Sequence, residues 1–355
     1  MFDPFTGQVV FSPSFSPRPS IKHVLLDFDG TLSLIREGWP AVMMEMFLEM
    51  LPRRAGEEGA RHCDREPLPH PANEARGDGW GEGHKRAPKQ AQQQFPGVGG
   101  PPLPQPLSSK GGEGNRVVGG GSVNMRPEEE AGDRQMLWDD MMRLNGKQTI
   151  YQMIQLAERI RERGGQPREP LWYKHEYLRR LDEKIAGRRQ EIRSGAVSRE
   201  KYLVCGSLDL LEELRRRGLR LYLASGTDEP FVKAEAELLG LMPYFGSHVY
   251  GALDDYKKFS KKMVIERILR EIQVPGDQLL AFGDGYVEIQ NTKEVGGLAV
   301  AVASDEANNG SGNFDAWKRN RLLEVGADVV IPDFRDAAPL LRCILDGAPR
   351  PDTSC

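Results

Sequence analysis

From about residue 205 onward, the sequence alternates between short apolar runs and longer amphipathic segments. The apolar runs are typical of buried strands and lie at residues 219–224, 249–252, 279–282, 298–303 and 329–331. The segments with helical spacing lie at residues 208–217, 231–239, 261–272, 287–295 and 336–345. Strands that alternate with helices predict a parallel sheet with helices on both faces. An earlier apolar run, HVLLDFD at residues 23–29, adds one more strand.

A helical region separates this first strand from the others. Residues 39–51 and 136–192 show no strand pattern, and apolar residues recur in them at helical spacing. We therefore expect a helical domain inserted into an α/β domain. The expected boundaries are residues 21–35 and 201–346 for the α/β core and residues 36–200 for the insertion.

A low-complexity segment interrupts the helical insertion at residues 52–132. Between residues 96 and 121, 14 of 26 residues are Gly or Pro. Such a composition cannot bury enough apolar surface to offset the entropy of ordering, so we expect this segment to be disordered. Solvated filler is favoured over an interaction tether. Residues 1–20 and 347–355 are expected to be flexible tails.

Charge and composition exclude several classes of partner. The formal net charge of -4 gives no reason to expect a nucleic-acid partner or an anionic membrane surface. No run approaches the ~18 apolar residues of a membrane helix, and the first twenty residues lack the pattern of a secretory signal. The four cysteines are scattered, which is typical of reduced thiols. We expect a cytoplasmic protein.

Two carboxylates follow the first strand. Asp27 and Asp29 are spaced i and i+2, so at a strand end their side chains leave the sheet on the same side. In open α/β sheets, ligands bind at the carboxyl ends of the strands. An ordinary Asp-Gly turn has the same sequence, so this motif alone favours chemistry only weakly.

Two further candidate groups could bind phosphate. Ser225 and Gly226 end the strand at 219–224 and can offer a hydroxyl and a backbone N–H to a phosphate oxygen. Taken alone, Ser225 is more simply a helix cap. Lysine binds phosphate as a point charge, and four lysines precede or open the helix at 261–272, namely Lys257, Lys258, Lys261 and Lys262.

A second acidic pair follows the strand at 279–282. Asp284 ends that strand, and Glu288 lies one helical turn further on. Two carboxylates at such a junction are costly unless a cation neutralises them. Magnesium prefers a few carboxylate oxygens together with water and substrate phosphate. The alternative is a Gly-Asp-Gly turn with an incidental Glu.

Taken together, the four sites resemble the motifs of the haloacid dehalogenase superfamily. The first motif of that family, Asp-x-Asp-Gly-Thr, is present as residues 27–31. The second, an apolar strand ending in Ser or Thr, is present as residues 221–225. The motif lysine best matches Lys261, at the start of a helix, and Lys258 is the alternative.

The fourth family motif matches Gly283-Asp284 followed by Glu288, where the family more often has Asp. The resemblance covers residues 21–51 and 133–346. It implies a Rossmann-like α/β core with a parallel sheet and an inserted α-helical cap, as in the phosphoglycolate phosphatase group.

The resemblance implies two catalytic residues and a phosphate site. Asp27 would attack phosphorus and form an aspartyl-phosphate, while Asp29 would protonate the leaving oxygen and later activate water. Ser225, Gly226 and Lys261 would bind the phosphate.

Magnesium is the cofactor that the resemblance implies. Its expected ligands are the Asp27 carboxylate, the Asp29 backbone carbonyl and Asp284, with Glu288 orienting ligands or water. The expected function is hydrolysis of a small phosphorylated metabolite, such as a sugar phosphate or a phosphoglycolate-like acid. A phosphomutase and a non-catalytic phosphometabolite-binding protein remain alternatives.

The expected cap limits the substrate to a small molecule, because a bulky phosphoprotein would not fit beneath it. The polar residues of the insertion are more often solvated helix faces than substrate contacts. Those considered are Arg36, Glu37, Lys147, Thr149, Lys174 and His175. No protein partner follows from the sequence.

Overall fold

The structure is a computed structural model that describes residues 5–53, 127–253, 255–258, 260–273 and 275–350. The low-complexity segment expected at residues 52–132 lies outside these residues except at its two ends. The expected tails are described only over residues 5–20 and 347–350.

The described residues form one seven-stranded sheet with the order β1-β7-β6-β5-β2-β3-β4. Every pairing is parallel except that of β1 with β7. This arrangement confirms the predicted α/β class with a mostly parallel sheet. The strands are β1 (Val10–Phe11), β2 (His23–Leu26), β3 (Arg220–Asp228), β4 (Val249–Ala252), β5 (Leu279–Gly283), β6 (Leu298–Val302) and β7 (Val329–Ile331).

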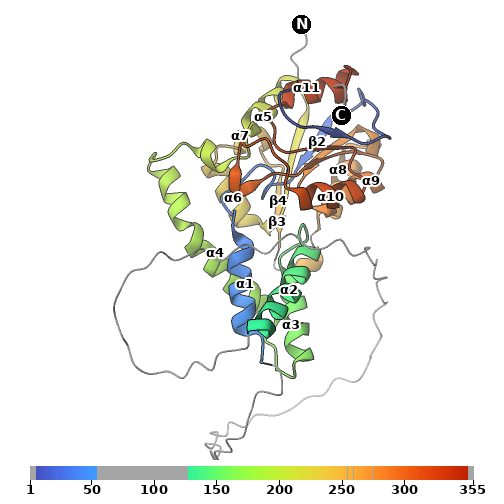
Figure 1. Cartoon of the computed structure of the whole chain (residues 1–355). Coiled ribbons are helices and arrows are strands. Elements are labelled where there is room, and N and C mark those ends of the chain that lie inside the picture. Colours follow the sequence, from blue (N-terminus) through green and yellow to red (C-terminus); the bar gives the residue numbers. More distant parts are fainter. Residues whose placement is uncertain (1–4, 54–126, 254, 259, 274, 351–355) are drawn as a thin grey trace, which may run out of the picture.

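Helices cover both faces of the sheet (Figure 1). Alternate residues of β2 point to opposite faces, so Leu26 belongs to one core cluster with Leu210 of α5, while Leu25 packs in another with Ile265 of α8. All four residues of β2 are buried, as expected for a central strand of a parallel sheet. The helices of this part are α5 (Ser207–Arg216), α6 (Glu229–Leu238), α7 (Met242–Phe245), α8 (Lys261–Ile272), α9 (Tyr286–Glu294), α10 (Ala316–Glu324) and α11 (Ala337–Leu341).

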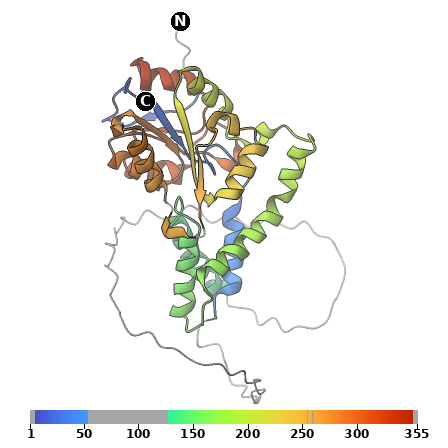
Figure 2. The same cartoon turned by 180° about the vertical axis from the view of Figure 1, so that it is seen from behind.

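In the described residues between β2 and β3, the first four α-helices form a separate bundle beside the α/β part, to which the fifth, α5, belongs (Figures 1 and 2). Apolar side chains at helical spacing in α3 are buried against the neighbouring helices, among them Met153, Leu156 and Ile160. This burial stabilises the bundle, because single helices of this length are marginal in water. The helices are α1 (Trp39–Met50), α2 (Pro127–Arg143), α3 (Ile150–Glu162) and α4 (Pro170–Arg193).

The N-terminal segment differs from the expected flexible tail. Val10 and Phe11 form β1 and pair with β7 at the sheet edge. The backbone N–H groups of Thr6 and Gly7 donate to the carboxylate of Asp336, at 2.9 and 2.7 Å. These long-range contacts are invisible in the local sequence, which contains only short apolar runs broken by prolines.

Two helices also differ from the sequence analysis. Helix α2 begins at Pro127, inside the segment expected to be disordered, and α10 lies where no helix was expected. Among the described residues, no helix is both long and apolar enough to cross a membrane.

Candidate active site

Three adjacent strands bring the sequence motifs together. β2 lies between β3 and β5, and Leu26 is in register with Leu223 on one side and Phe282 on the other. Asp27 comes directly after this point, and the other motifs follow the same level in β3 and β5. The motif residues therefore lie together at the carboxyl end of the central strands, where ligands bind in open α/β sheets.

Asp27 is a buried carboxylate with a cationic neighbour. Its Oδ1 accepts a hydrogen bond from the Phe28 N–H at 2.8 Å and lies 2.8 Å from Nζ of Lys261. Burial raises the pKa of Asp27 from 3.8 to about 7; Lys261 opposes this rise, and the nearby carboxylates of Asp284 and Asp29 add to it. Asp27 thus needs more positive charge beside it to be fully ionised at neutral pH.

Lys261 and Lys258 occupy different environments. Lys261 begins α8, whose N-cap is the Ser260 side chain, and its ammonium contacts both Asp27 and Glu288. The Lys261 side chain is 4% exposed, whereas that of Lys258 is 76% exposed and pairs with Asp255. Only Lys261 of this pair reaches the strand ends.

Asp29 lies among hydroxyl groups. Ser225 Oγ and Thr227 Oγ1 donate to Asp29 Oδ2 at 3.0 and 2.8 Å. The other oxygen, Oδ1, is buried without a hydrogen-bond partner. The Ser225 hydroxyl therefore lies against the expected acid–base residue. The sequence analysis missed Thr227. It lies two residues after Ser225, and residues i and i+2 of a strand point to the same face.

Two buried cationic side chains from the segment between β2 and β3 pair with carboxylates of the α/β part. Nη2 of Arg36 lies 2.8 Å from Glu235 Oε1, and Nε of Arg36 lies 3.7 Å from Asp29 Oδ1. Lys174 of α4 lies 2.7 Å from Asp228 at the end of β3. Arg36 and Lys174 are buried, so the expectation that they belong to solvated helix faces was wrong. Their partners are nearly 200 and more than 50 positions away in the sequence, beyond the reach of a local pattern.

Asp284 contacts a lysine that the sequence analysis missed. The Asp284 N–H donates to Thr31 Oγ1 at 3.0 Å, which fixes the turn after β5 beside the first motif. Asp284 Oδ2 lies 3.0 Å from Nζ of Lys318, which also contacts Glu306. Burial opposes the charged form of Lys318, but Asp284 and Glu306 raise its pKa above the ordinary value, so it remains an ammonium ion.

A family model described as haloacid dehalogenase-like hydrolase matches residues 21–296, which is most of the chain. The chain belongs to this family of hydrolases. The resemblance inferred from the motifs is therefore confirmed, as is the prediction of a hydrolase of this superfamily. No curated protein matches the sequence.

Several solved structures of haloacid dehalogenase-like proteins are similar to this hydrolase. A predicted phosphoglycolate phosphatase from Haemophilus somnus has 10% identity and a TM-score of 0.45, covering 90% of this chain and 98% of that one. A protein of unknown function from Agrobacterium tumefaciens has 12% identity and a TM-score of 0.47, covering 91% and 98%. A hydrolase from Deinococcus radiodurans, with bound phosphate and sodium, has 12% identity and a TM-score of 0.42, covering 92% and 96%. At such low sequence identities and TM-scores, these similarities carry no argument about the function of this hydrolase.

The donor groups of this hydrolase suit a hard divalent cation. Asp27, Asp284 and Glu288 offer only oxygen atoms, the donors that magnesium prefers. Glu288 is 1% exposed, and its Oε2 has no hydrogen-bond partner. Within the described residues, however, no three His, Cys, Asp or Glu side chains form a ready metal-binding group. Lysines contact the carboxylates instead, with Lys261 at Glu288 and Lys318 at Asp284. The chemistry of the site fits a cation that would share these carboxylates with the lysines.

The site of the hydrolase opens into a cavity of about 90 Å³ between the bundle and the strand ends. Residues from both parts line it, including Asp27, Asp29 and Ser225 from the α/β part and Lys147 and Thr149 from the bundle. The turn at Gly146 lies close to the backbone of Gly285 in the α/β part. A Cβ on Gly146 would lie 3.1 Å from that backbone, and the φ of Gly146 is 89°. Glycine at 146 is what permits this contact.

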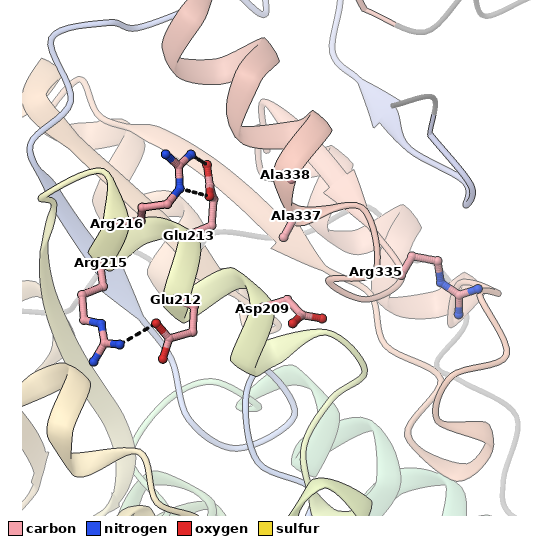
Figure 3. A pocket seen from close by; sticks show the side chains of 8 residues that line it. All are labelled: Asp209, Glu212, Glu213, Arg215, Arg216, Arg335, Ala337 and Ala338. Atoms are coloured by element: carbon pink, nitrogen blue, oxygen red, sulfur yellow. Dashed lines mark hydrogen bonds and ion pairs between the residues drawn. The ribbon is translucent and has the colours of Figure 1, made fainter. Parts of the chain in front are cut away.

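A larger hollow of about 720 Å³ lies between α5 and α11 (Figure 3). Four of its charged side chains on α5 form two pairs, Arg215 with Glu212 and Arg216 with Glu213. None of the motif side chains lines it, so the smaller cavity is the candidate active site.

Proposed function

We propose that the chain is a magnesium-dependent phosphatase that hydrolyses a small phosphorylated metabolite through an aspartyl-phosphate on Asp27. The different surroundings of two neighbouring carboxylates carry this proposal. Asp27 lies against the Lys261 ammonium, while Asp29 lies against two hydroxyls and keeps one buried oxygen without a hydrogen bond. Carboxylates with distinct environments can act as nucleophile and as acid–base group in one reaction.

In the first step, a carboxylate oxygen of Asp27 attacks phosphorus, and the bond from phosphorus to the leaving oxygen breaks. Asp29 donates its proton to that leaving oxygen. In the second step, Asp29 takes a proton from water, and the water oxygen attacks the aspartyl-phosphate. Inorganic phosphate leaves and both carboxyl groups return to their starting states.

Positive charge and hydrogen-bond donors are the main catalytic requirement in phosphoryl transfer. Lys261, the Ser225 hydroxyl and the Gly226 N–H would bind the phosphate oxygens. Asp27, the Asp29 carbonyl and Asp284 would hold Mg²⁺, with Glu288 orienting ligands or water. The ion would supply charge that stabilises the phosphoryl group and favours ionised Asp27.

The size of the cavity supports a small substrate. A volume of about 90 Å³ corresponds to roughly three water molecules at about 30 Å³ each. This space suits a phosphoryl group, and the organic part of a sugar phosphate or a phosphoglycolate-like acid would need further room. The helical bundle would act as a cap that admits such a substrate by moving. We also propose a cytoplasmic location, because scattered cysteines are typical of reduced thiols.

Release of inorganic phosphate from a panel of small phosphate esters, with Mg²⁺ and with a chelator, tests this function. We expect Mg²⁺-dependent turnover that Asp27→Asn reduces at least ~1,000-fold. Asp255→Asn removes a surface carboxylate that pairs with exposed Lys258 and should keep full turnover. Full activity in Asp27→Asn would contradict the proposal, and transfer of phosphate to an isomeric product would identify a mutase.

A further inference from the structure

Lys318 lies in a part of the chain that the family model does not match, and yet it contacts an expected metal ligand. The residue is on α10, beyond residues 21–296, and its side chain is 9% exposed. Its Nζ lies 3.0 Å from Asp284 Oδ2 and 2.5 Å from Glu306 Oε1. A third contact is with Ser304 Oγ at 3.3 Å.

This group is attached to the first motif through the backbone of Gly30. Ser304 Oγ donates to the Gly30 carbonyl oxygen at 2.8 Å. A Cβ at Gly30 would clash with Asp284 Oδ2 and would lie 3.0 Å from Glu306 Oε1. One compact group beside the turn at Asp29 and Gly30 is therefore formed by Asp284, Glu306 and Lys318.

The charges of this group determine how well a cation can bind. Two carboxylates and one ammonium leave a net negative charge, so a divalent cation is attracted to the group as a whole. The ammonium has the same sign as the cation, however, and it already occupies one oxygen of Asp284. Like charges this close in a buried site repel strongly, because little water screens them.

We propose that Lys318 is a built-in counter-ion of Asp284 that competes with Mg²⁺ for this carboxylate and thereby sets the Mg²⁺ concentration needed to load the site. The inference rests on the proposed function, which places Mg²⁺ at Asp284. Glu306 has the opposite effect, because it draws the ammonium toward itself and adds negative charge. Lys318 is thus a positioning residue, and it touches neither the substrate nor the reacting atoms.

Calorimetric titration of metal-stripped protein with Mg²⁺ alone, without substrate, tests this directly. We expect Lys318→Met to lower the Kd for Mg²⁺ at least ~10-fold, because a repelling charge is lost. Lys318→Arg keeps the charge and should stay within about threefold of wild type. Glu306→Gln should raise the Kd at least ~3-fold, because an attracting charge is lost.

Lys258→Met is the matched control, since it removes one exposed lysine charge away from the site and should leave the Kd unchanged. An unchanged or higher Kd in folded Lys318→Met would overturn the inference. If Lys318→Met does not fold, Glu306→Gln decides, and an unchanged or lower Kd there would overturn it as well. Wild-type protein that binds no Mg²⁺ at all would refute the metal part of the proposed function. Wild-type protein that binds Mg²⁺ with the same Kd as folded Lys318→Met would overturn this inference alone.

Discussion

The ammonium of Lys261 lies 2.8 Å from Oδ1 of Asp27, and both side chains are almost fully buried. Lys261 begins α8, while Asp27 directly follows the central strand β2, so the contact joins two parts of the chain that are far apart in the sequence. The Lys261 ammonium is thus a direct counter-charge for the expected nucleophile.

Loss of this counter-charge should be severe for catalysis. We expect Lys261→Met to reduce kcat/KM at least ~100-fold, because both the phosphate and Asp27 lose a cationic partner. Steady-state kinetics with a small phosphate ester measures the effect. Lys258→Met, three residues earlier and exposed, is the matched control and should be within about twofold of wild type. Equal losses in the two variants would show that Lys261 has no special role.

Stability of the metal-free protein should depend on pH through Asp27. Its pKa is raised from 3.8 to about 7 in the folded chain, mainly by burial. As pH rises, the unfolded chain ionises first, so this contribution to stability is present below pH ~4 and is lost as the pH rises toward ~7. Asp27→Asn cannot ionise and should avoid that loss.

The free energy of unfolding of Asp27→Asn relative to wild type should therefore increase from pH ~4 to ~7, by on the order of 3 kcal/mol. Urea denaturation in the presence of a chelator measures it. Added Mg²⁺ should reduce the difference, because a cation favours ionised Asp27. A difference that stays constant across this pH range would contradict the burial argument.

The hydroxyl of Thr227 should matter for the acid–base group. Thr227→Val keeps the shape of the side chain but removes the donor that lies 2.8 Å from Asp29 Oδ2. We expect kcat to fall about 10-fold with KM within twofold, because the orientation of Asp29 is less well fixed. Thr227→Ser keeps the hydroxyl and should recover most of kcat. A change in KM alone would place Thr227 at the substrate instead.

Loss of one partner of the buried Arg36–Glu235 pair should lower the free energy of unfolding more than loss of both partners. Removing one partner leaves an unpaired buried charge, so Arg36→Met should destabilise the protein by about 3–5 kcal/mol. The double variant Arg36→Met with Glu235→Leu should recover much of that loss. Urea denaturation of the three variants and wild type completes a double-mutant cycle. Additive effects would show that the two side chains are not coupled.

The sequence was sufficient to predict the six parallel strands of the sheet, but not β1. Strands such as β4 and β7 are short, apolar and bounded by turn residues, and the structure has them at the expected residues. The strand ends then determine where Asp27 and Asp284 lie, because neighbouring parallel strands end at the same edge of the sheet.

The sequence was not sufficient for residues whose partners are distant. Lys318 lies in α10, a short helix rich in polar residues whose apolar pattern is too weak to show. Arg36 and Lys174 look like surface residues until the fold places Glu235 and Asp228 beside them. Burial of a charge depends on such tertiary contacts, and a local pattern does not contain them.

The most direct test of the proposed function is to locate the phosphoryl group on the protein. Asp29→Asn protein is mixed with Mg²⁺ and an aryl phosphate, whose leaving group departs without a proton from Asp29, then quenched with acid, digested and analysed by mass spectrometry. The account predicts a phosphoryl group on Asp27, because Asp29→Asn can no longer activate the water that removes it. Absence of phosphoryl on Asp27, together with retained turnover in Asp27→Asn, would contradict it.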